Sequence, residues 1–479
     1  MADPAQMTDE LAAIVGQDFV KTDPTETTQF SIDGIVPKAV VYPKNTRQVS
    51  EVVKYANSKN LAIVPWGGGS KITMGHPPTR LDLVVCTRRM NHMKDVDVSN
   101  LTVTVEAGVK FLDIQARLAT EDDRCYLPLE DLITDGNEMI CSDRSHSGCF
   151  LPIDPPCPTR ATIGGIIAAD SSGPRRLLYT LPRDLILGIR FVAADGEIIG
   201  SGGKTVKNVS GYDISKLMVG SAGSLGILCE MTLRLLPLPE AMETLLFSFD
   251  AFADASGFID RIFDTQLLPA AVEIMNRNAF GKIMRGAVSG FQAGAFVVPV
   301  ALEAFQEAVD RMRNEMKKMA AESNATAEAV LPETEHRPFW LAVGDLNPSV
   351  AENHPGRITA RLNYPVAAWK EIIEYAEAAL EEGGIDHTLL AHAGSGVCLI
   401  NLMITGNGDR DQAADAVSKL LKRCLKSHGN LVIEQAPVEM KQKLPIWGEA
   451  GSDLVVMKRI KQTLDPRNVM SPGRYVAGL

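Results

Sequence analysis

The chain has 479 residues, 45% of them hydrophobic and 22% charged, which is the composition of a folded globular protein with about two to four domains. The net charge is −11. Because an acidic surface repels phosphate backbones, nucleic acid is excluded as an expected partner, although a local basic patch can still serve an anionic substrate.

Features of targeting and of disulfide scaffolds are missing from the sequence. It contains no run of 18 apolar residues, so we expect no membrane-spanning helix. The start, Met1 to Pro4, lacks the basic and apolar parts of a secretory signal. Eight cysteines are too few for a disulfide framework. We therefore expect a cytoplasmic protein, either free or held at a membrane by partners.

Short elements alternate in the first hundred residues. Apolar spacing predicts a helix over 7–20 and a second one over 45–60, which Asn45 can cap. A strand is expected at 39–42, between two prolines, and another at 61–64. The second strand runs directly into a loop with three consecutive glycines, Gly67 to Gly69.

Strand-like runs dominate from about residue 81 to 240, and an irregular stretch over 120–160, rich in Pro, Asp and Cys, separates them. The expected strands are 81–86, 101–105, 186–193, 197–199 and 225–236.

The pattern changes after the sequence Pro237-Leu238-Pro239. Helical spacing at 305–319, 369–380 and 413–424 alternates with strand-like runs at 294–298, 398–402 and 431–434. Methionines in the first of these helices are more typical of a core than of a binding surface. We predict four parts: an N-terminal helical segment (1–36), a first domain (37–240), an α+β cap (241–440) and a C-terminal tail (441–479).

Two common nucleotide-binding loops are excluded. A dinucleotide-binding fingerprint needs a third glycine where Ile72 stands. Gly203-Lys204-Thr205 resembles the end of a phosphate loop, but Ile198 stands in place of its first glycine.

Three loops rich in small residues, each next to an expected strand, remain to be explained: 67–71, 162–173 and 219–227. Glycine lets the backbone approach a ligand closely. Three such loops can line one long ligand, and a flavin dinucleotide is long, flat and carries a diphosphate.

Several motifs then occur in a fixed order. They are 65–71 (PWGGGSK), 152–155 (PIDP), 161–165 (ATIGG), 183–188 (RDLILG), 203–213 (GKTVKNVSGYD), 219–227 (VGSAGSLGI) and 464–474 (LDPRNVMSPGR). Together they resemble the FAD-binding flavoproteins of the p-cresol methylhydroxylase and vanillyl-alcohol oxidase type. Within that group the chain is most similar to the glycolate oxidase and D-lactate dehydrogenase branch.

The resemblance implies an α+β protein, in which a two-lobed FAD-binding domain is followed by a cap with an antiparallel sheet and a tail that returns to the first domain. Some relatives attach FAD through a histidine in the first glycine loop, whereas this chain has Ser70 and Lys71 there, so we expect noncovalent FAD. The implied cofactor-binding residues are Pro65, Trp66, Gly67, Gly68, Gly69, Ser70, Lys71, Pro152, Asp154, Thr162, Gly164, Gly165, Ala168, Asp170, Ser171, Gly226 and Ile227.

The cap departs from the signatures of the metal-dependent members of that branch. Where they have His-x-Gly-Asp-Gly-Asn-x-His, the chain keeps His392 but has Ser395 and Leu399. Where they have Gly-Glu-His-Gly, it keeps Glu434 but has Gln435. A substrate-binding arginine is also replaced, by Gly344. We therefore expect no metal.

Four residues are candidates for the catalytic site. His392 can be a base near the flavin, or only a polar residue at the start of a strand. Glu434 can act in the site or only pair with a lysine. Tyr179 and Arg183 follow a flavin loop and can face the flavin ring or substrate, or serve packing and ion pairing. A further residue, Arg474, can meet the substrate or the flavin end of the site, or be a surface arginine near the C-terminus.

Two functions stay open. The first is an FAD-dependent dehydrogenase subunit that oxidises a small 2-hydroxy acid of the glycolate or D-lactate type and passes electrons to a protein partner. The second is a non-catalytic FAD-binding electron-transfer or scaffold subunit. The resemblance implies a sister flavoprotein, an iron–sulfur subunit, or both, as partners.

The irregular stretch holds Cys125, Cys141, Cys149 and Cys157 without a Cys-x-x-Cys pair, so free thiols are favoured over a metal cluster. We predict that this stretch, with Asp131, Cys141 and His146, lies at a contact with an iron–sulfur partner; the alternative is a solvent-facing loop.

Overall fold

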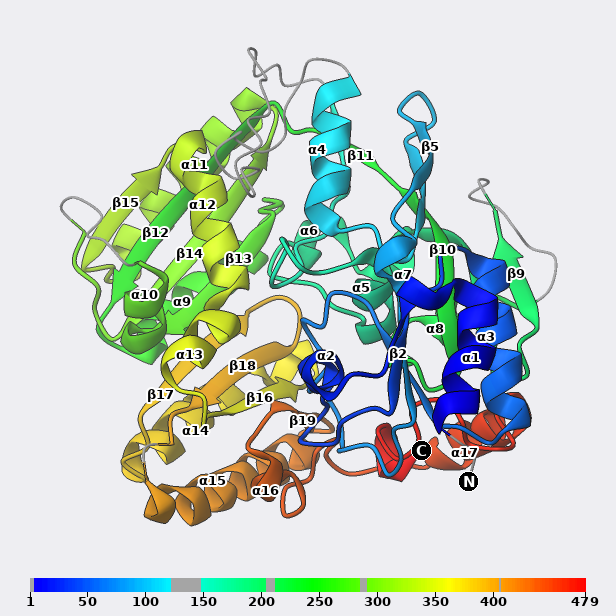
Figure 1. Ribbon diagram of the computed structural model, residues 1–479. Coiled ribbons are helices and arrows are strands. Elements are labelled where there is room, and N and C mark those ends of the chain that lie inside the picture. The colour runs from blue at the N-terminus through cyan, green and yellow to red at the C-terminus, as the bar shows by residue number, and fades with distance from the viewer. Residues whose placement is uncertain (1–3, 122–147, 204–211, 285–290, 405) are drawn as a thin grey trace.

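The computed structural model describes residues 4–121, 148–203, 212–284, 291–404 and 406–479. Two bodies lie side by side (Figure 1). The first, which we call the first domain, contains the elements from α1 to β11, and the second, the cap, contains those from β12 to α16. The expected α+β class is confirmed.

Two sheets form the two lobes of the first domain. One has the order β1-β2-β4-β3 with its last three strands parallel, and the other is antiparallel with the order β5-β6-β10-β8-β9. A small antiparallel pair, β11-β7, forms a separate sheet. The strands are β1 (Val20–Lys21), β2 (Ala39–Val41), β3 (Ile63–Trp66), β4 (Leu83–Cys86), β5 (Met93–Asp97), β6 (Thr102–Glu106), β7 (Cys149–Phe150), β8 (Ile186–Ala193), β9 (Ile198–Gly202), β10 (Gly226–Arg234) and β11 (Leu236–Pro237).

The helices of the first domain cover these sheets. They are α1 (Pro4–Val15), α2 (Pro24–Thr27), α3 (Thr46–Ser58), α4 (Phe111–Glu121), α5 (Ile163–Ala169), α6 (Arg176–Tyr179), α7 (Pro182–Leu185) and α8 (Ile214–Met218), with 3-10 turns at Gln17–Phe19, Thr28–Phe30 and Thr87–Arg89. The side chain of Asn45 accepts a hydrogen bond from the backbone of Gln48, so the predicted cap of α3 is confirmed.

The cap is built on one antiparallel sheet with the strand order β15-β12-β14-β13-β17-β18-β16-β19. Its antiparallel character is the one that the family resemblance implied. The strands are β12 (Ala241–Phe249), β13 (Ala271–Asn276), β14 (Phe296–Ala304), β15 (Ala327–Leu331), β16 (Ile358–Asn363), β17 (His387–His392), β18 (Val397–Leu402) and β19 (Asn430–Gln435).

Helices of the cap bury their apolar faces in its core, where Met312 and Met316 of α11 are buried as expected. The helices are α9 (Phe252–Phe263), α10 (Arg277–Ile283), α11 (Gln306–Glu322), α12 (Glu333–Gly344), α13 (Leu346–Asn353), α14 (Trp369–Glu382), α15 (Asn407–Lys426) and α16 (Val438–Lys441), with a 3-10 turn at Val366–Ala368.

After the cap, the chain returns to the first domain through α17 (Leu454–Leu464) and ends in a 3-10 turn at Val476–Gly478 (Figure 1). The backbone of Ile63 in β3 donates to Val469 and accepts from Ser471, at 2.7 and 2.8 Å. The buried ammonium of Lys461 donates to the carbonyl groups of Ser224 and Met470, both at 2.8 Å. The tail thus packs against β3, the strand that leads into the first glycine loop, and supports that loop.

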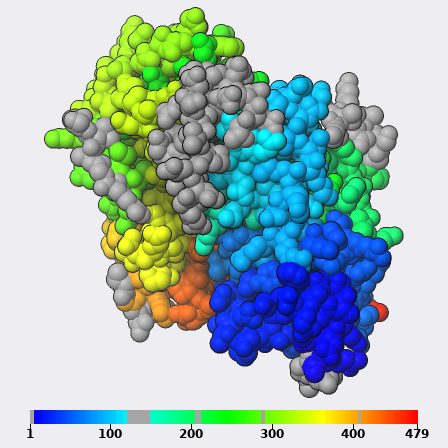
Figure 2. All heavy atoms as spheres, turned by 45° about the horizontal axis from the view of Figure 1, so that its top comes forward, coloured from blue at the N-terminus to red at the C-terminus, as the bar shows by residue number. Residues whose placement is uncertain are grey.

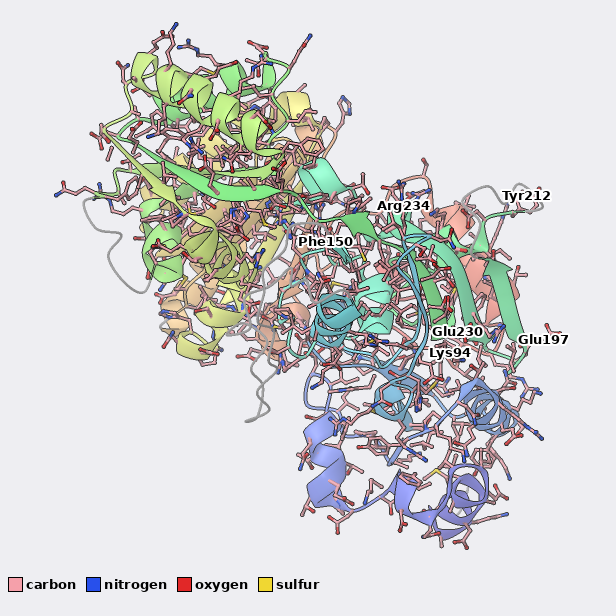
Figure 3. The ribbon with its side chains drawn as sticks, turned by 90° about the horizontal axis from the view of Figure 1, so that it is seen from above. Lys94, Phe150, Glu197, Tyr212, Glu230 and Arg234 are labelled. Atoms are coloured by element: carbon pink, nitrogen blue, oxygen red, sulfur yellow. The ribbon has the colours of Figure 1, made fainter. Side chains whose placement is uncertain are left out.

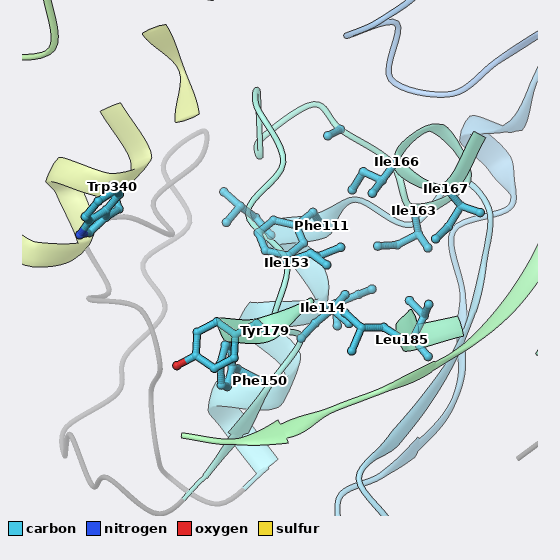
Figure 4. Close-up of a cluster of buried hydrophobic side chains, with 14 of the residues drawn as sticks. Phe111, Ile114, Phe150, Ile153, Ile163, Ile166, Ile167, Tyr179, Leu185 and Trp340 are labelled. Atoms are coloured by element: carbon cyan, nitrogen blue, oxygen red, sulfur yellow. The ribbon is translucent and has the colours of Figure 1, made fainter. Parts of the chain in front are cut away.

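Contacts of different kinds stabilise the first domain and join it to the cap. An apolar cluster runs from Phe111 and Ile163 to Phe150 and Tyr179, and reaches toward Trp340 of the cap (Figure 4). On the surface, Lys94 of β5 reaches Glu230 of β10 at 2.5 Å (Figure 3). Such an exposed pair contributes little to stability compared with the apolar cluster.

The helix expected over 7–20 is shorter than predicted. It ends at Val15 because Gly16 adopts a φ of 97°, which favours glycine. A 3-10 turn and β1 follow, so the N-terminal segment is not purely helical. Met7 and Leu11 of α1 are buried in the core that α3 also forms, which attaches this segment to the first domain.

Candidate active site

Two adjoining cavities lie where the glycine loops meet the cap. The larger, about 560 Å³, lies between the first domain and the cap sheet, and the smaller, about 110 Å³, lies within the first domain. Their walls share Ser70, Lys71, Met74 and Ala169, so the two form one continuous trench. In the space-filling view of Figure 2, the blue first domain and the yellow and orange parts of the cap meet along a seam.

The smaller cavity is lined by backbone, as a flavin dinucleotide requires. A Cβ on Gly164 would come within 2.8 Å of the Ala107 side chain, and one on Gly68 within 1.7 Å of the Arg160 carbonyl oxygen, so these positions accept only glycine. Gly165 differs, because only the Thr162 hydroxyl, at 3.3 Å, lies near its Cβ position. The predicted cofactor residues that line this cavity are Pro65, Trp66, Gly67, Gly68, Gly69, Ser70, Lys71, Gly164, Gly165, Ala168, Gly226 and Ile227.

Arg474 adds a positive charge to the same cavity. Its side chain is buried, with 5% of the residue exposed, and donates from Nη2 to the carbonyl groups of Ile72 and Met74. Nη1 is buried without a hydrogen-bond partner. A glycine-lined trench with an unpaired guanidinium nitrogen fits a ligand with a diphosphate or a polar ring edge.

Five of the predicted cofactor residues lie elsewhere. Ser171 lines the larger cavity instead. Thr162 caps α5, Asp154 accepts hydrogen bonds from the backbones of Gly173 and Arg175, and Pro152 is buried. Asp170 ends α5 in the left-handed conformation. Four of the predicted residues thus do not line the two cavities: Thr162, Asp154, Pro152 and Asp170. They instead shape the loop that lines the cavities.

Lys71 and Glu434 meet at the junction of the two cavities. The Lys71 Nζ lies 2.5 Å from Glu434 Oε2, and Arg361 of β16 lies 3.4 Å from Glu434 Oε1. Burial opposes ionisation of Glu434, but the charges of Lys71 and Arg361 outweigh it and leave the pKa of Glu434 below its usual value. Glu434 therefore pairs with a lysine, as one interpretation of the sequence held, and does so at the wall of the large cavity.

His392 faces the larger cavity from the end of β17, not from the start of a strand as expected. Only 3% of the residue is exposed, and Nδ1 lies 2.7 Å from Glu273 Oε2 on β13. Burial and the nearby Arg176 lower the pKa of His392 to about 3, so the imidazole is neutral at pH 7. With Nδ1 bound to Glu273, Nε2 is the nitrogen left for a ligand.

Farther along the sheet, Gln435 connects the two bodies. Its Nε2 donates to the Thr73 hydroxyl of the first domain at 3.1 Å, and its Oε1 accepts from the Arg357 guanidinium. Arg357, Thr73 and Gln435 all line the larger cavity. The glutamine in place of a histidine thus serves to position a cation.

The structure corrects the positions expected for Tyr179 and Arg183. The Tyr179 hydroxyl donates to Glu303 at 2.6 Å, and the ring packs on Phe150 at 5.3 Å (Figure 4). Arg183 is exposed, and neither residue lines the two cavities. The reason is that α6 and α7 direct these side chains to the interface with the cap and to solvent.

The donor set in the cap does not fit a divalent metal. Leu399 lines the cavity where the resemblance placed a second histidine, and a leucine side chain cannot coordinate an ion. Glu434 is already paired with two cations. Within the described ranges, no group of three or more His, Cys, Asp or Glu side chains is arranged to hold a metal.

The cysteine group is only partly described. Cys149 is buried in β7, and Cys157 is a half-buried free thiol at the larger cavity. Cys125, Cys141, Asp131 and His146 lie outside the described residues, as does the predicted partner contact.

The motifs missed four charged residues of the larger cavity or its wall: Glu273, Arg176, Arg357 and Arg361. Glu273 and His392 are 119 residues apart in the chain, so no local motif links them. A weak signal was available, since Glu273 interrupts an apolar strand, and Arg357 and Arg361 alternate with apolar residues along β16.

Two protein-family models match this chain. The model of the FAD binding domain matches residues 37–129 and 144–202, and that of the C-terminal domain of FAD linked oxidases matches residues 238–475. The chain belongs to the FAD-linked oxidases. It is therefore an oxidoreductase with FAD as its cofactor, and the predicted family is confirmed.

Curated relatives match nearly the whole chain. Glycolate oxidase subunit GlcD of Bacillus subtilis is 28% identical, and the match covers 92% of this chain and 89% of that protein. A D-lactate dehydrogenase of Archaeoglobus fulgidus is 27% identical, and the match covers 92% of this chain and 91% of that protein. A D-2-hydroxyglutarate dehydrogenase of Stutzerimonas stutzeri is 23% identical over 100% of both chains.

A solved structure supports the fold. p-Cresol methylhydroxylase with substrate bound superposes with a TM-score of 0.75, at 15% identity, over 98% of this chain and 96% of that chain. At this identity the similarity shows the two-domain fold alone.

We expect the FAD to be released intact by acid. The first glycine loop has Ser70 and Lys71 where a covalent histidine would stand, and Lys71 is engaged by Glu434. Precipitating the purified protein with acid should leave the yellow colour in the supernatant, measured by absorbance. Flavin that precipitates with the protein, and is released only as flavin-bound peptides when the pellet is digested with a protease, would contradict noncovalent binding.

Proposed function

We propose that this chain oxidises a 2-hydroxy acid, of the class to which glycolate and D-lactate belong, and passes the electrons to a protein partner. The observation that carries the proposal is a neutral, buried His392 that faces a cavity with three nearby cations, Lys71, Arg176 and Arg361. The names of two relatives, a glycolate oxidase subunit and a D-lactate dehydrogenase, support it.

The cations give the carboxylate of such a substrate a place. Arg361 shares Glu434 with Lys71, and its Nε is buried without a hydrogen-bond partner. Arg176 donates to the Ser172 hydroxyl at 2.6 Å and lines the same wall. Lys71 and Arg361 share a single carboxylate, and Arg176 donates to a neutral hydroxyl, so a substrate carboxylate can pair with these cations through charge-assisted hydrogen bonds.

His392 supplies the base. Glu273, fully buried, fixes the orientation of the ring through Nδ1. Burial raises the pKa of Glu273, and either form of its carboxyl group can accept the Nδ1 hydrogen; in that tautomer Nε2 accepts the proton of the substrate hydroxyl. A pKa near 3 is low for a base, but a substrate carboxylate would reverse the effect of Arg176 and raise the pKa of His392. FAD, when bound, supplies the two-electron acceptor for the hydride.

In this site, guanidinium and ammonium groups supply the positive charge that a divalent ion would supply to the hydroxyl and carboxylate. Arg361 of β16 and His392 of β17 lie on opposite sides of β18, where Arg361 pairs with Leu399 and His392 pairs with Val397, two residues away. Both residues line the larger cavity, so the arginine and the base face the same substrate space.

The experiment is anaerobic bleaching of the bound flavin by a panel of 2-hydroxy acids, with and without a chelator. We expect at least one acid to bleach the 450 nm band. We expect the rate to be unchanged by the chelator because Leu399 cannot coordinate a metal and the Gln435 amide oxygen already accepts a hydrogen bond from Arg357. A flavin that no acid reduces would contradict the proposed function. Loss of bleaching with the chelator, restored by zinc or manganese, would contradict metal independence alone.

For the electron acceptor we propose a protein, because the B. subtilis relative is named as a subunit. Among the described residues, no helix is long and apolar enough to cross a membrane. Purification from the native host under mild conditions should recover the chain with a second protein, such as a sister flavoprotein or an iron–sulfur protein, that reoxidises the reduced flavin. A lone monomer that turns over rapidly with dioxygen would contradict this.

A further inference from the structure

Arg357 is a buried cation that the oxidation step described above does not use. Only 4% of the residue is exposed, yet it lines the larger cavity. One guanidinium nitrogen donates to the neutral Gln435, and Nε is buried without a partner. No carboxylate of the described residues forms an ion pair with it. A buried, unpaired charge is costly, which points to a ligand that completes it.

The position of Arg357 separates it from the reacting end of the cavity. Arg357 directly precedes β16, and Thr359 and Arg361 follow it at every second residue. All three line the cavity, so they share one face of the sheet. Val397 of β18 pairs with His392 on one side and with Asn363 on the other, so these three residues form one row across the sheet. Arg361 lies two residues before Asn363 in the chain, and Arg357 lies six residues before it. The Cα atoms of Arg357 and Arg361 are therefore about 13 Å apart along the strand.

The diphosphate of FAD does not account for Arg357. The glycines that allow close backbone approach (Gly67 to Gly69, Gly164, Gly165 and Gly226) and Arg474 line the smaller cavity alone, whereas Arg357 lines only the larger one. Loop residue Thr73 holds Gln435 at 3.1 Å, and Gln435 in turn holds the guanidinium. The site is thus built from both bodies, and its geometry is fixed before a ligand enters.

We propose that Arg357 binds a second anionic group of the substrate, so that the substrate class is a 2-hydroxy acid with a carboxylate or phosphate at its far end. This rests on the proposed function. The α-carboxylate and hydroxyl lie at Arg361 and His392, and the far group forms charge-assisted hydrogen bonds with Arg357 and replaces the missing counter-charge.

Matched substrates test this on the unmodified holoprotein. 2-Hydroxyglutarate and 2-hydroxypentanoate differ only in that a terminal carboxylate replaces a methyl group, and 2-hydroxyadipate and 2-hydroxyhexanoate form a longer pair. We expect kcat/KM for flavin reduction to be about 10- to 100-fold higher for the diacid of at least one pair, as for a hydrogen bond to a charged group. Equal or better reduction by the monoacids would overturn the proposal. Glycerate 3-phosphate distinguishes a phosphate from a carboxylate at the far end.

The variant Arg357→Met should remove the preference. We expect the diacid to lose about 10- to 100-fold in kcat/KM, mostly through KM, and the monoacid to change little. Arg357→Lys should recover part of the preference because it keeps the charge. Arg423→Met is the matched control: it removes an arginine of α15 that pairs with Glu371 outside the cavity, and both substrates should keep their rates.

The outcomes separate the two claims. If both substrates lose the same factor in Arg357→Met, or if it fails to fold while the unmodified protein shows no preference for diacids, Arg357 is structural and the inference is wrong. If no 2-hydroxy acid of either kind reduces the flavin of the unmodified protein, the proposed function itself is wrong.

Discussion

Replacing His392 by asparagine is expected to lower the rate of flavin reduction by about 10²- to 10⁴-fold, the usual contribution of a general base. Asparagine can still donate a hydrogen bond to Glu273, so the buried carboxyl keeps its partner. Because His392 does not line the glycine-lined cavity, the FAD content should not change. Stopped-flow reduction and the flavin-to-protein ratio measure both effects.

Added imidazole should restore part of the rate in this variant, since the cavity of about 560 Å³ can admit it. Rescue would be absent if His392 only supported the strand. A rate in His392→Asn equal to that of the unmodified protein would show that another group takes the proton.

The pH dependence follows from the same residue. Because burial and Arg176 lower the pKa of His392 to about 3, the free protein holds a neutral base at all pH values above that. On the acid side, kcat/KM should therefore not fall through pH 6.5, where an ordinary histidine would protonate. A bound carboxylate raises the pKa, so kcat should fall at a higher pH than kcat/KM. An acid limb of kcat/KM near pH 6.5 would contradict the assignment.

The second large effect is expected at Gly165, where leucine should abolish FAD binding. The Cβ position of Gly165 is free except for the Thr162 hydroxyl at 3.3 Å, and the residue lines the smaller cavity. Leucine is a better helix former than glycine by up to about 1 kcal/mol, so α5 should tolerate it. The side chain would instead fill space that the cofactor needs. Absorbance at 450 nm after purification, and after incubation with excess FAD, measures the loss.

Gly257→Leu provides the matched control, because Gly257 lies in α9 of the cap with no atom within 4 Å of its Cβ position. This variant should keep its flavin. The melting temperature of Gly165→Leu should equal that of unmodified protein stripped of FAD, because both lack the stabilisation that bound ligand gives. A variant that melts below the stripped protein, or one that keeps full flavin, would show that the glycine has another role.

Gly68 illustrates why the choice of glycine matters. From the sequence, a bulky residue at Gly68 should block the backbone from the cofactor. In the structure, even a Cβ there would come within 1.7 Å of the Arg160 carbonyl oxygen, so the protein itself would be disrupted. Loss of FAD in such a variant would not report on cofactor contact.

Elements with local signals could be predicted from the sequence. The cap of α3 at Asn45, the apolar spacing of α11 and α14, and the strand that leads into Gly67 are all readable from neighbouring residues, because helices and strands obey short periods. The same holds for the glycine loops, whose residues fix the backbone locally. These features predicted the α+β fold, the family and the cofactor.

The tertiary structure alone decided the active site. Glu273 lies beside His392 because β13 pairs with β17 across a gap of more than a hundred residues, and Lys71 reaches Glu434 because the cap sheet lies against the first glycine loop. Tyr179 followed a cofactor loop in sequence but faces Glu303, since α6 turns it to the domain interface. Charges act through space over several ångströms, so which carboxyl neutralises which cation, and which cation stays unpaired, depends on distant strands coming together.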